Sequence, residues 1–492
     1  MMKRAMKDRQ HGAMSLLAGL LLGSSALVHA EDVELLARAN QPAPAPSGST
    51  PAYTPAQDDE EAKKAKQNPA FLFIEGLPLP EITSAQLTMI RQNLRSFDSP
   101  YSGPLSLNGH GSTKSTYTAG VYLGWEPVKH TQFYLDFEKF QGEGISNATG
   151  LASLTDGDAV RAGASGLSHR VYTARAYVRH LIPLGDAAHD LQRSQDQVTT
   201  SEPDTRIELK GGIMAVSDDF DHNRYANSTR TQFQNWSLFN NTAWDFAADT
   251  RGYTTGVLVG YVSPVWAARL GVYKMPQHAN GQPLAALSQA RGQNFEVSWT
   301  QPKANGAVVR FLVYQNVATM GDYNEAILQG QLAGQAPDIQ SDGKHDRHKN
   351  GVALNAELPL ADDGETGLFT RLGWNDGHTE SFAFTEMDRV LSVGAQVDGA
   401  HWSRGADRLG IAYVLGGLSS QHRAYLEAGG QGFVLGDGQL NYAPEQVLEA
   451  YYRFEPVKGL QWSPDVQYIV NPGFNHDRGP ATVYGIRLHL EY

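Results

Sequence analysis

Charged side chains recur at every second position in several short segments of this 492-residue chain. In "VYTARAYVRH", Arg175 and Arg179 would share one face of a strand, with Tyr177 between them. Guanidinium groups donate hydrogen bonds as a fork, carboxylates accept them, and an aromatic ring offers a flat face for stacking. Such a set can replace the hydration water of a hydroxyl-rich solute. The candidate residues are Arg175, Tyr177, Arg179, Arg206, Glu208, Lys210, Arg269 and Arg310.

Three of these arginines give the sharpest hypothesis for a site. Arg175, Arg179 and Arg206 fall on consecutive predicted strands, and Glu208 follows closely in "RIELK". We expect this cluster to form part of a constriction in which carboxylates hold the guanidinium forks in place. The alternative is that each side chain hydrogen-bonds into a protein wall, away from any solute.

Patterns that would indicate catalysis or a metal are weaker. The 16 histidines and many serines make chance Ser–His pairs inevitable, so a hydrolase stays an alternative. The segment "SDGKHDRHKN" (341–350) has metal-ligand types but is expected to be a solvated loop. No HExxH motif is present, and "DGDAV" and "DDFDHN" lack the spacing of a calcium loop. We therefore expect no metal and no cofactor. Arg251 in "ADTRGYT" is expected to pin a loop through Asp249.

Strands must position the candidate residues, because the sequence alternates with a period of two. In "TQFYLDFEKF", Phe133 and Leu135 fall on one face, and Asp136 and Glu138 fall on the other. The last segment, "ATVYGIRLHLEY" (481–492), alternates in the same way and has tyrosines near both ends of its apolar face. One face is therefore apolar and the other polar or charged.

A soluble β-sandwich and a membrane barrel both fit such strands. Repeated charges on one face suit a water-filled lumen, and aromatic residues near the strand ends of the other face suit a lipid interface. At about 24 residues for each strand with its connection, residues 117–492 accommodate roughly 16 strands. We predict an all-β protein, a transmembrane antiparallel β-barrel of about 16 strands in which the last strand closes against the first.

The N-terminus predicts export. Lys3, Arg4, Lys7 and Arg9 precede the short apolar run "AMSLLAGLLLG", and "VHA" ends at Ala30. This pattern is typical of a secretory signal peptide cleaved after Ala30. Removing residues 1–30 takes away four bases and one acid, so the formal charge changes from −12 to −15. That acidity argues against nucleic acid as a partner. The chain has no cysteine, so its fold cannot depend on disulfides.

Composition divides the rest of the chain. Residues 31–70 are rich in proline and alanine, then charged, and are predicted to be a linker, with at most a short helix. Residues 71–110 contain the amphipathic segment "EITSAQLTMIRQNLRSF", which is predicted to be a helix that packs in or beneath the barrel. Residues 111–492 are predicted to form the barrel.

Several separated stretches occur in an order that resembles the carbohydrate-selective porin family, OprB-type. They are "QGEGISNATGLASLTDGDAVRAG" (141–163), "FDHNRYANSTRTQFQNW" (220–236), "AWDFAADTRGYTTG" (243–256), "YKMPQHANG" (273–281), "LGWNDG" (372–377), "FAFTEMDRVLS" (382–392), "HRAYLEAGGQGFVLGDGQLNYAPEQVLEAYY" (422–452) and "NPGFNHDRGPATVYGIRLHLEY" (471–492). The resemblance implies a 16-stranded barrel and passive, sugar-preferring diffusion across the bacterial outer membrane. The proline-rich N-terminal extension departs from the family pattern.

The predicted function is therefore that of an outer-membrane porin and not an enzyme. Its partners would be sugars and outer-membrane lipid, and the oligomer could be a monomer or a trimer. The alternatives are an outer-membrane barrel hydrolase and a secreted β-sandwich that binds carbohydrate.

Overall fold

The computed structural model describes residues 80–159, 170–303, 305–384 and 386–492, and residues 80–492 form one compact unit. The strands of the main sheet are β1 (Glu81–Leu94), β2 (Ser112–Val128), β3 (Thr131–Gly142), β4 (Tyr172–Pro183), β7 (Arg206–Met214), β8 (Thr254–Val262), β9 (Trp266–Lys274), β10 (Arg291–Thr300), β11 (Val308–Met320), β12 (Lys344–Ala361), β13 (Thr366–Asn375), β14 (Arg389–Asp398), β15 (Arg408–Gly417), β16 (Glu445–Val457), β17 (Leu460–Val470) and β18 (Ala481–Glu491). A separate pair contains β5 (Ala188–Leu191) and β6 (Thr200–Pro203). The α-helices among the described residues are α4 (Trp236–Phe239), α5 (Tyr323–Ala333) and α6 (Ser420–Glu427).

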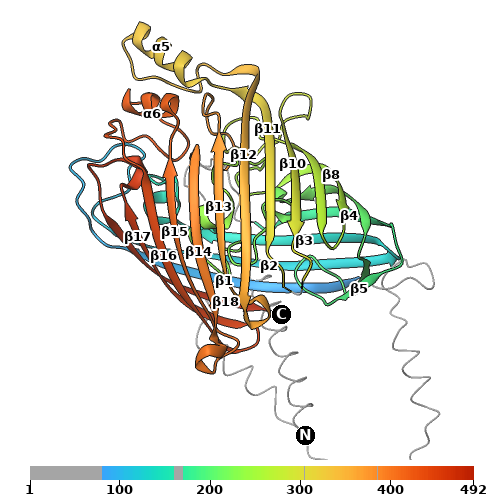
Figure 1. The fold of residues 1–492 in the computed structure, drawn as a ribbon. Helices are drawn as coiled ribbons and strands as arrows, with labels where there is room; N and C mark the ends of the chain where they lie inside the picture. The colour runs from blue at the N-terminus through green and yellow to red at the C-terminus, as the bar shows by residue number, and fades with distance from the viewer. Residues whose placement is uncertain (1–79, 160–169, 304, 385) are drawn as a thin grey trace, which may run out of the picture. The chain divides into compact units, whose positions relative to one another are not determined.

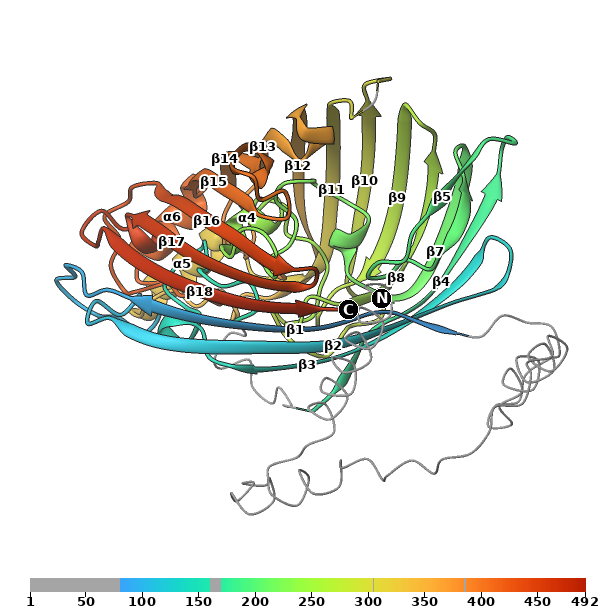
Figure 2. The same ribbon diagram turned by 90° about the horizontal axis from the view of Figure 1, so that it is seen from below.

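The main sheet closes on itself as a 16-stranded barrel (Figure 1). Every neighbouring pair of strands is antiparallel, and β18 completes the ring against β1 in the register Gln86↔Glu491 to Leu94↔Val483. Figure 2 shows the C-terminus beside β1. The predicted strand number and the predicted closure of the last strand against the first are confirmed. A closed ladder leaves no free edge, which holds the sheet together without disulfides.

The prediction of a helix within residues 71–110 is wrong where the structure describes it. The amphipathic segment is strand β1, so the barrel begins at Glu81 and not near residue 111. The apolar side chains of Ile90 and Leu94 point to the inside of the barrel, where they are buried. Leu94 packs there in an apolar cluster with Ile145 and Leu151. Apolar residues on both faces break the strand alternation and imitate helical spacing. The predicted signal peptide (1–30) and linker (31–70) lie outside the described residues.

The two faces of the strands differ as their alternation predicts. In β3, the outward Phe133 and Leu135 are exposed, whereas the inward Asp136 and Glu138 are buried. The outward apolar side chains continue around the barrel and include aromatic residues: Tyr261, Trp266, Phe311, Trp374, Trp462, Tyr468, Tyr484 and Tyr492. Such a surface is suited to lipid. Among the described residues, none of the helices has the length and apolarity needed to cross a bilayer.

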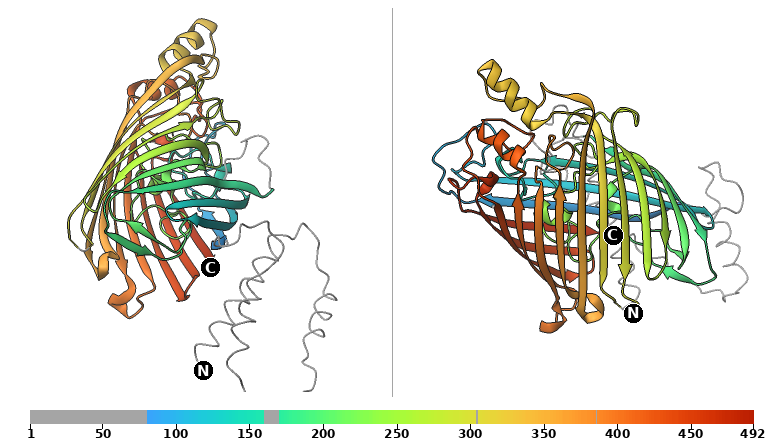
Figure 3. Two further views of the ribbon diagram at one scale, coloured as in Figure 1. Left: turned by 90° about the vertical axis from the view of Figure 1, so that its right-hand side faces the viewer. Right: turned by 45° about the horizontal axis from the view of Figure 1, so that its top comes forward.

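The two ends of the barrel have different connections. At the end where β18 stops, β2–β3 and β16–β17 are joined by the two-residue turns 129–130 and 458–459. The opposite end has longer connections, among them those that contain α5 and α6. These two helices pack against each other at that end, as the two views of Figure 3 show.

Two of the long connections fold into the barrel interior, the lumen. Residues 215–253, between β7 and β8, cross to other walls, where the carboxylate of Glu449 on β16 accepts hydrogen bonds from the backbone N–H groups of Gln234 and Asn235. The described part of the β3–β4 connection, 143–159, also turns inward, and Ser153 N–H donates to Glu445 at 2.9 Å. We call these segments the crossing loop (215–253) and the inner loop (143–159). Together they fill much of the lumen.

Candidate functional site

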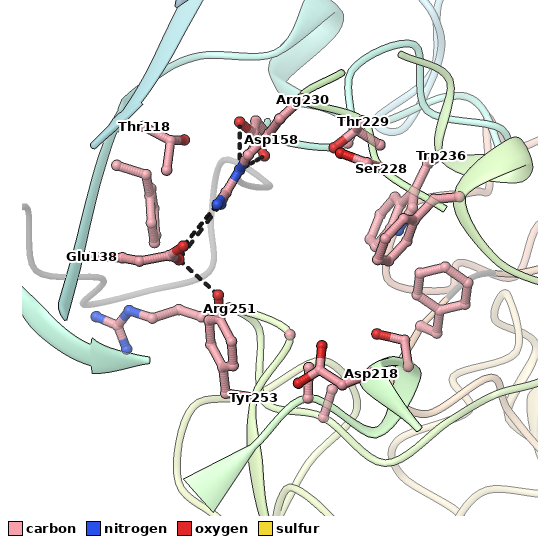
Figure 4. Close-up of a pocket in the computed structure, with 18 of the residues that line it drawn as sticks. Thr118, Glu138, Asp158, Asp218, Ser228, Thr229, Arg230, Trp236, Arg251 and Tyr253 are labelled. Carbon is pink, nitrogen blue, oxygen red and sulfur yellow. Dashed lines mark hydrogen bonds and ion pairs between the residues drawn. The ribbon is translucent and has the colours of Figure 1, made fainter. Parts of the chain in front are cut away.

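A cavity of about 490 Å³ remains in the lumen between the crossing loop and the wall formed by β2, β3 and β4. Its volume falls in the range of protein sites for small molecules. Figure 4 shows that its lining has two unlike sides, with charged and hydroxyl groups around Glu138 and Arg230 on one and Trp236 on the other. The cavity is therefore amphipathic.

The polar side is organised around the carboxylate of Glu138. Arg230 of the crossing loop donates to it, with Nη1 2.7 Å from Oε1. Tyr253 and Tyr172 both donate to Oε2, at 2.7 and 3.0 Å, and Tyr122 donates to Oε1 at 2.8 Å. Four donors thus fix one buried carboxylate. Glu138 points into the lumen because it occupies an inward position in the alternation of β3. A fully bonded carboxylate of this kind holds the side chains of its donors in fixed positions beside the cavity.

Arg230 also holds the inner loop in place. Its Nε lies 3.1 Å from Oδ1 of Asp158, so the guanidinium bridges a strand residue and a loop residue. Burial alone would lower the pKa of Arg230, but Asp158 and Glu138 outweigh burial and hold it well above its ordinary value. The bridge therefore keeps its positive charge at every pH the protein meets.

A second arginine network includes Asp218, which is labelled in the lower part of Figure 4. Arg175 on β4 donates two hydrogen bonds to Asp218, both of 2.7 Å, and its Nε lies 3.5 Å from Asp196. Burial raises the pKa of Asp218, but Arg175 more than offsets this, so the pKa lies below its ordinary value. Asp196 belongs to the β4–β7 connection, so residues from both barrel ends meet at this network.

The opposite side of the cavity is aromatic. The ring of Trp236 meets Phe384 edge to face at 4.9 Å, and Phe384 lies 4.3 Å from Phe246. Asn235 caps the short helix α4 by accepting from Ser237 N–H, which fixes the direction of Trp236. Such a surface can stack on the C–H face of a ring-shaped solute.

The eight candidates from the sequence do not form one cluster. Arg175 alone among them lines the cavity. Arg179 and Arg206 instead pair with Glu202 of β6, and Arg179 also pairs with Glu208. The others are distributed as follows: Tyr177 stacks on Tyr134 at 5.0 Å, Lys210 pairs with Asp219 at 2.9 Å, Arg269 lies 3.9 Å from Glu208, and Arg310 lies 3.1 Å from Glu357.

The backbone and the side chain of Arg251 make different contacts. Its backbone N–H donates to Asp249 at 2.9 Å, as does that of Tyr253 at 3.2 Å, so Asp249 shapes the loop. Its guanidinium lies over the ring of Tyr172 at 4.8 Å and lines the cavity. The loop contact that the sequence suggested is therefore made by the backbone of Arg251 and not by its side chain.

Sequence reasoning missed most of the cavity lining. Asp158, Arg230, Trp236 and Tyr253 are the main omissions, and Glu138 was placed on an inward face without being named as a candidate. The four loop residues all lie within the stretches 141–163, 220–236 and 243–256, which carry the family resemblance. That resemblance was the one signal that could have selected them.

No group of three histidine, aspartate or glutamate side chains in the described part of the chain is arranged to hold a metal ion. The segment 341–350 is not wholly a loop, because β12 begins at Lys344. There, His345 contacts Thr319 at 2.7 Å, and Arg347 pairs with Asp342 at 2.7 Å.

The barrel is similar to known proteins in both sequence and structure. Residues 120–492 match the model of the family described as carbohydrate-selective porin, OprB family. No curated protein matches the chain. The OprB protein of Pseudomonas putida, in a structure determined at high pH, is 17% identical, with a TM-score of 0.63 over 84% of this chain and 94% of that one. The same protein at low pH gives 14% identity and a TM-score of 0.41, over 83% and 93% of the two chains. An anion-selective porin from Comamonas acidovorans gives 11% and 0.45, over 84% and 100%.

Proposed function

The chain belongs to the OprB family of carbohydrate-selective porins, and from that premise we propose that sugars cross its barrel by way of the cavity between the crossing loop and β2–β4. The protein is an outer-membrane porin for passive diffusion of small sugars. Its family and fold are those of a channel rather than an enzyme. The location of the passage is the new element of the proposal.

The observation that supports this passage is the two-sided lining of the cavity. A sugar has hydroxyl groups around its rim and C–H groups on its faces. Arg230, Tyr253 and Thr118 lie on one side of the cavity, and the edge-to-face aromatic pair Trp236–Phe384 lies on the other. A sugar between the two sides can exchange water for hydrogen bonds at its rim while its face contacts the rings. An apolar solute gains only the second contact.

Within this passage, we propose that Arg175 contacts the solute directly. Its guanidinium donates along its Nε–Nη2 edge to Asp218 and lies 5.4 Å from the centre of the Tyr253 ring. The other seven candidates are proposed to line the lumen farther along its length, mostly toward the end where β18 stops: Tyr177, Arg179, Arg206, Glu208, Lys210, Arg269 and Arg310. Their ion pairs would hold the passage open without selecting the sugar.

Export and assembly complete the proposal. The signal peptide is proposed to be removed after Ala30, which N-terminal sequencing of the protein from outer membranes would test. Cross-linking of the purified protein in detergent would distinguish a monomer from a trimer.

The passage is tested by reconstitution in liposomes. We expect faster swelling with glucose than with tetraethylene glycol, an uncharged solute without the sugar's ring of hydroxyls. Replacing Arg175 by Ala should raise single-channel conductance and lower this preference by about threefold or more, because a charge-assisted hydrogen bond is lost. The control is Arg91→Ala on the outer face of β1, which should change neither quantity.

Two outcomes would contradict the proposal. A folded protein that gives neither conductance steps nor swelling would not be a porin. A porin whose preference for glucose survives Arg175→Ala would pass sugar elsewhere in the lumen. Hydrolysis of a sugar ester or glycoside by the same preparation would favour the barrel hydrolase.

A further inference from the structure

The charged groups that line the cavity are unequal in number. Five are carboxylates and three are guanidinium groups; His222 also lines it, and an imidazole is mostly neutral at pH 7. The carboxylates are those of Glu138, Asp158, Asp196, Asp218 and Asp249, and the guanidinium groups are those of Arg175, Arg230 and Arg251. With all eight ionised, the lining carries two more negative charges than positive ones.

The two arginine networks differ in which groups they expose. Glu138 and Asp158 together compensate the single guanidinium of Arg230, whose side chain is 21% exposed, whereas theirs are 1% and 8% exposed. Arg175 lies between Asp218 and Asp196, and its side chain is only 8% exposed, whereas those of Asp218 and Asp196 are 25% and 20% exposed. Around Arg175, a passing solute therefore meets carboxylate oxygens more than guanidinium N–H groups.

The neighbouring basic residues do not reverse this balance at the cavity. Arg179 and Arg206 share the carboxylate of Glu202, and Lys210 pairs with Asp219. None of these three bases lines the cavity. Because Arg179 also pairs with Glu208, the three carboxylates Glu202, Glu208 and Asp219 match these three bases in number.

We propose, building on the proposed function, that this cavity selects sugars by charge. It passes neutral sugars and protonated amino sugars and discriminates against sugar acids such as uronates and sugar phosphates. A cleft lined by an excess of one charge concentrates ions of the other sign, and carboxylates lining a pore favour cations. One uncompensated unit charge about 5 Å from the solute changes its occupancy by about fourfold even in a water-like dielectric.

Asp196 offers the sharpest test of this selectivity. It lies on the β4–β7 connection, 3.5 Å from Nε of Arg175, and also contacts Gln195 at 3.4 Å and the carboxyl group of Asp136. An asparagine has nearly the same shape. Asp190 is on the same connection, in β5, and is exposed away from the cavity lining. Asp196→Asn and Asp190→Asn thus make the same change in net charge, but only the first acts inside the cavity.

The experiment uses the full-length mature protein in planar bilayers and in liposomes. Under a KCl gradient, we expect the reversal potential of the wild type to show cation selectivity. Asp196→Asn should lower the K⁺/Cl⁻ permeability ratio by about twofold to fourfold, and Asp190→Asn should leave it unchanged. In liposomes with the membrane potential clamped to zero, protonated glucosamine should enter faster than glucuronate, with glucose as the neutral reference.

The results separate the two claims. Absence of glucose entry would overturn the proposed function itself. Glucose entry with an anion-selective reversal potential, or with glucuronate as fast as glucosamine, would overturn charge selection and leave the porin intact. An equal response of the Asp196→Asn and Asp190→Asn variants would assign the selectivity to the barrel as a whole and not to the cavity.

Discussion

Two sets of arginines point into the lumen from different parts of the molecule. Arg371 on β13 and Arg487 on β18 are fully buried, and their guanidinium groups donate mainly to backbone carbonyls of the crossing loop. Arg175 on β4 and Arg230 on the loop itself are paired mainly with carboxylates and line the cavity. The first set anchors the loop, and the second set faces the passage.

The comparison shows that an inward position on a strand does not by itself determine the role of a lumen residue. Arg371 and Arg175 both occupy inward positions on strands, yet Arg371 is fully buried by the crossing loop, whereas Arg175 pairs with Asp218 of that loop and still lines the cavity. What separates them is the path of residues 215–253, which packs directly on parts of β13, β16 and β18 but leaves a cavity where it faces the β2–β4 wall. The following predictions test that division, beginning with the largest expected effect.

Removal of an anchor should damage the fold. Arg371 donates to the carbonyl oxygens of Leu238 and Ala226, at 3.0 and 2.7 Å, and lies 3.0 Å from Asp221. Arg371→Met would remove the hydrogen bonds to these two carbonyl groups and the positive charge beside the buried carboxylate of Asp221. We expect a loss of about 3–5 kcal/mol in the free energy of unfolding, measured by urea titration in detergent.

Arg91→Met, on the outer face of β1, is the control for this loss. The same measurement should find its stability within about 0.5 kcal/mol of the wild type. If Arg371→Met is equally stable and conducts normally, the crossing loop does not depend on this anchor.

A change at Glu138 in the cavity should destabilise the fold less than Arg371→Met does and should change the preference for glucose more. Glu138→Gln keeps the shape but weakens the contact to Arg230, and an amide N–H₂ in place of Oε2 would have to donate to Tyr253 and Tyr172, which are donors to Glu138. We expect a cost of about 1–3 kcal/mol in unfolding and a clear loss of glucose preference in liposome swelling. Unchanged preference in a folded Glu138→Gln protein would place the sugar path away from this carboxylate.

The inner loop should make stability depend on pH. Burial, with the nearby Asp158, raises the pKa of Asp156 to about 7. In the unfolded chain the pKa is about 3.9, so between these values the folded protein binds more protons. Stability from this group is therefore present at low pH and is lost as pH rises toward 7.

The variant Asp156→Asn should remove this contribution. We expect urea titrations between pH 5 and pH 7 to show a decrease of about 1–2 kcal/mol for the wild type and a smaller one for the variant. Equal pH dependence in the two proteins would show that Asp156 is ionised in the folded state at both pH values.

The sequence predicted the wall of the barrel better than its contents. Alternation in β3 and β18 gave the correct faces, because the outward side always meets the same apolar surroundings. It failed in β1, where Leu94 points inward but packs against the inner loop, so both faces are apolar. Sixteen strands were expected from residue 117 onward, and the structure reaches the same number by starting at Glu81.

The cavity could not be predicted from the alternation of the strands, because most of its lining residues lie in the connections between them. Arg230 and Glu138 are 92 residues apart in the chain, and nothing in either segment shows that they meet. Arg175 was selected because it lies on a strand. Trp236 and Tyr253 became recognisable as lining only once the path of the crossing loop was known.

The central claim is that solute passes through the cavity, and thiol labelling tests it directly. The chain has no cysteine, so Ser228→Cys introduces a single thiol in the lining, and Ser341→Cys introduces one in an exposed position outside it. A cationic methanethiosulfonate reagent should lower the single-channel conductance of the Ser228→Cys protein, and glucose should slow that reaction; Ser341→Cys should react without a change in conductance. If Ser228→Cys is labelled to completion and both its conductance and its glucose entry stay unchanged, the cavity is not on the path and the account is contradicted.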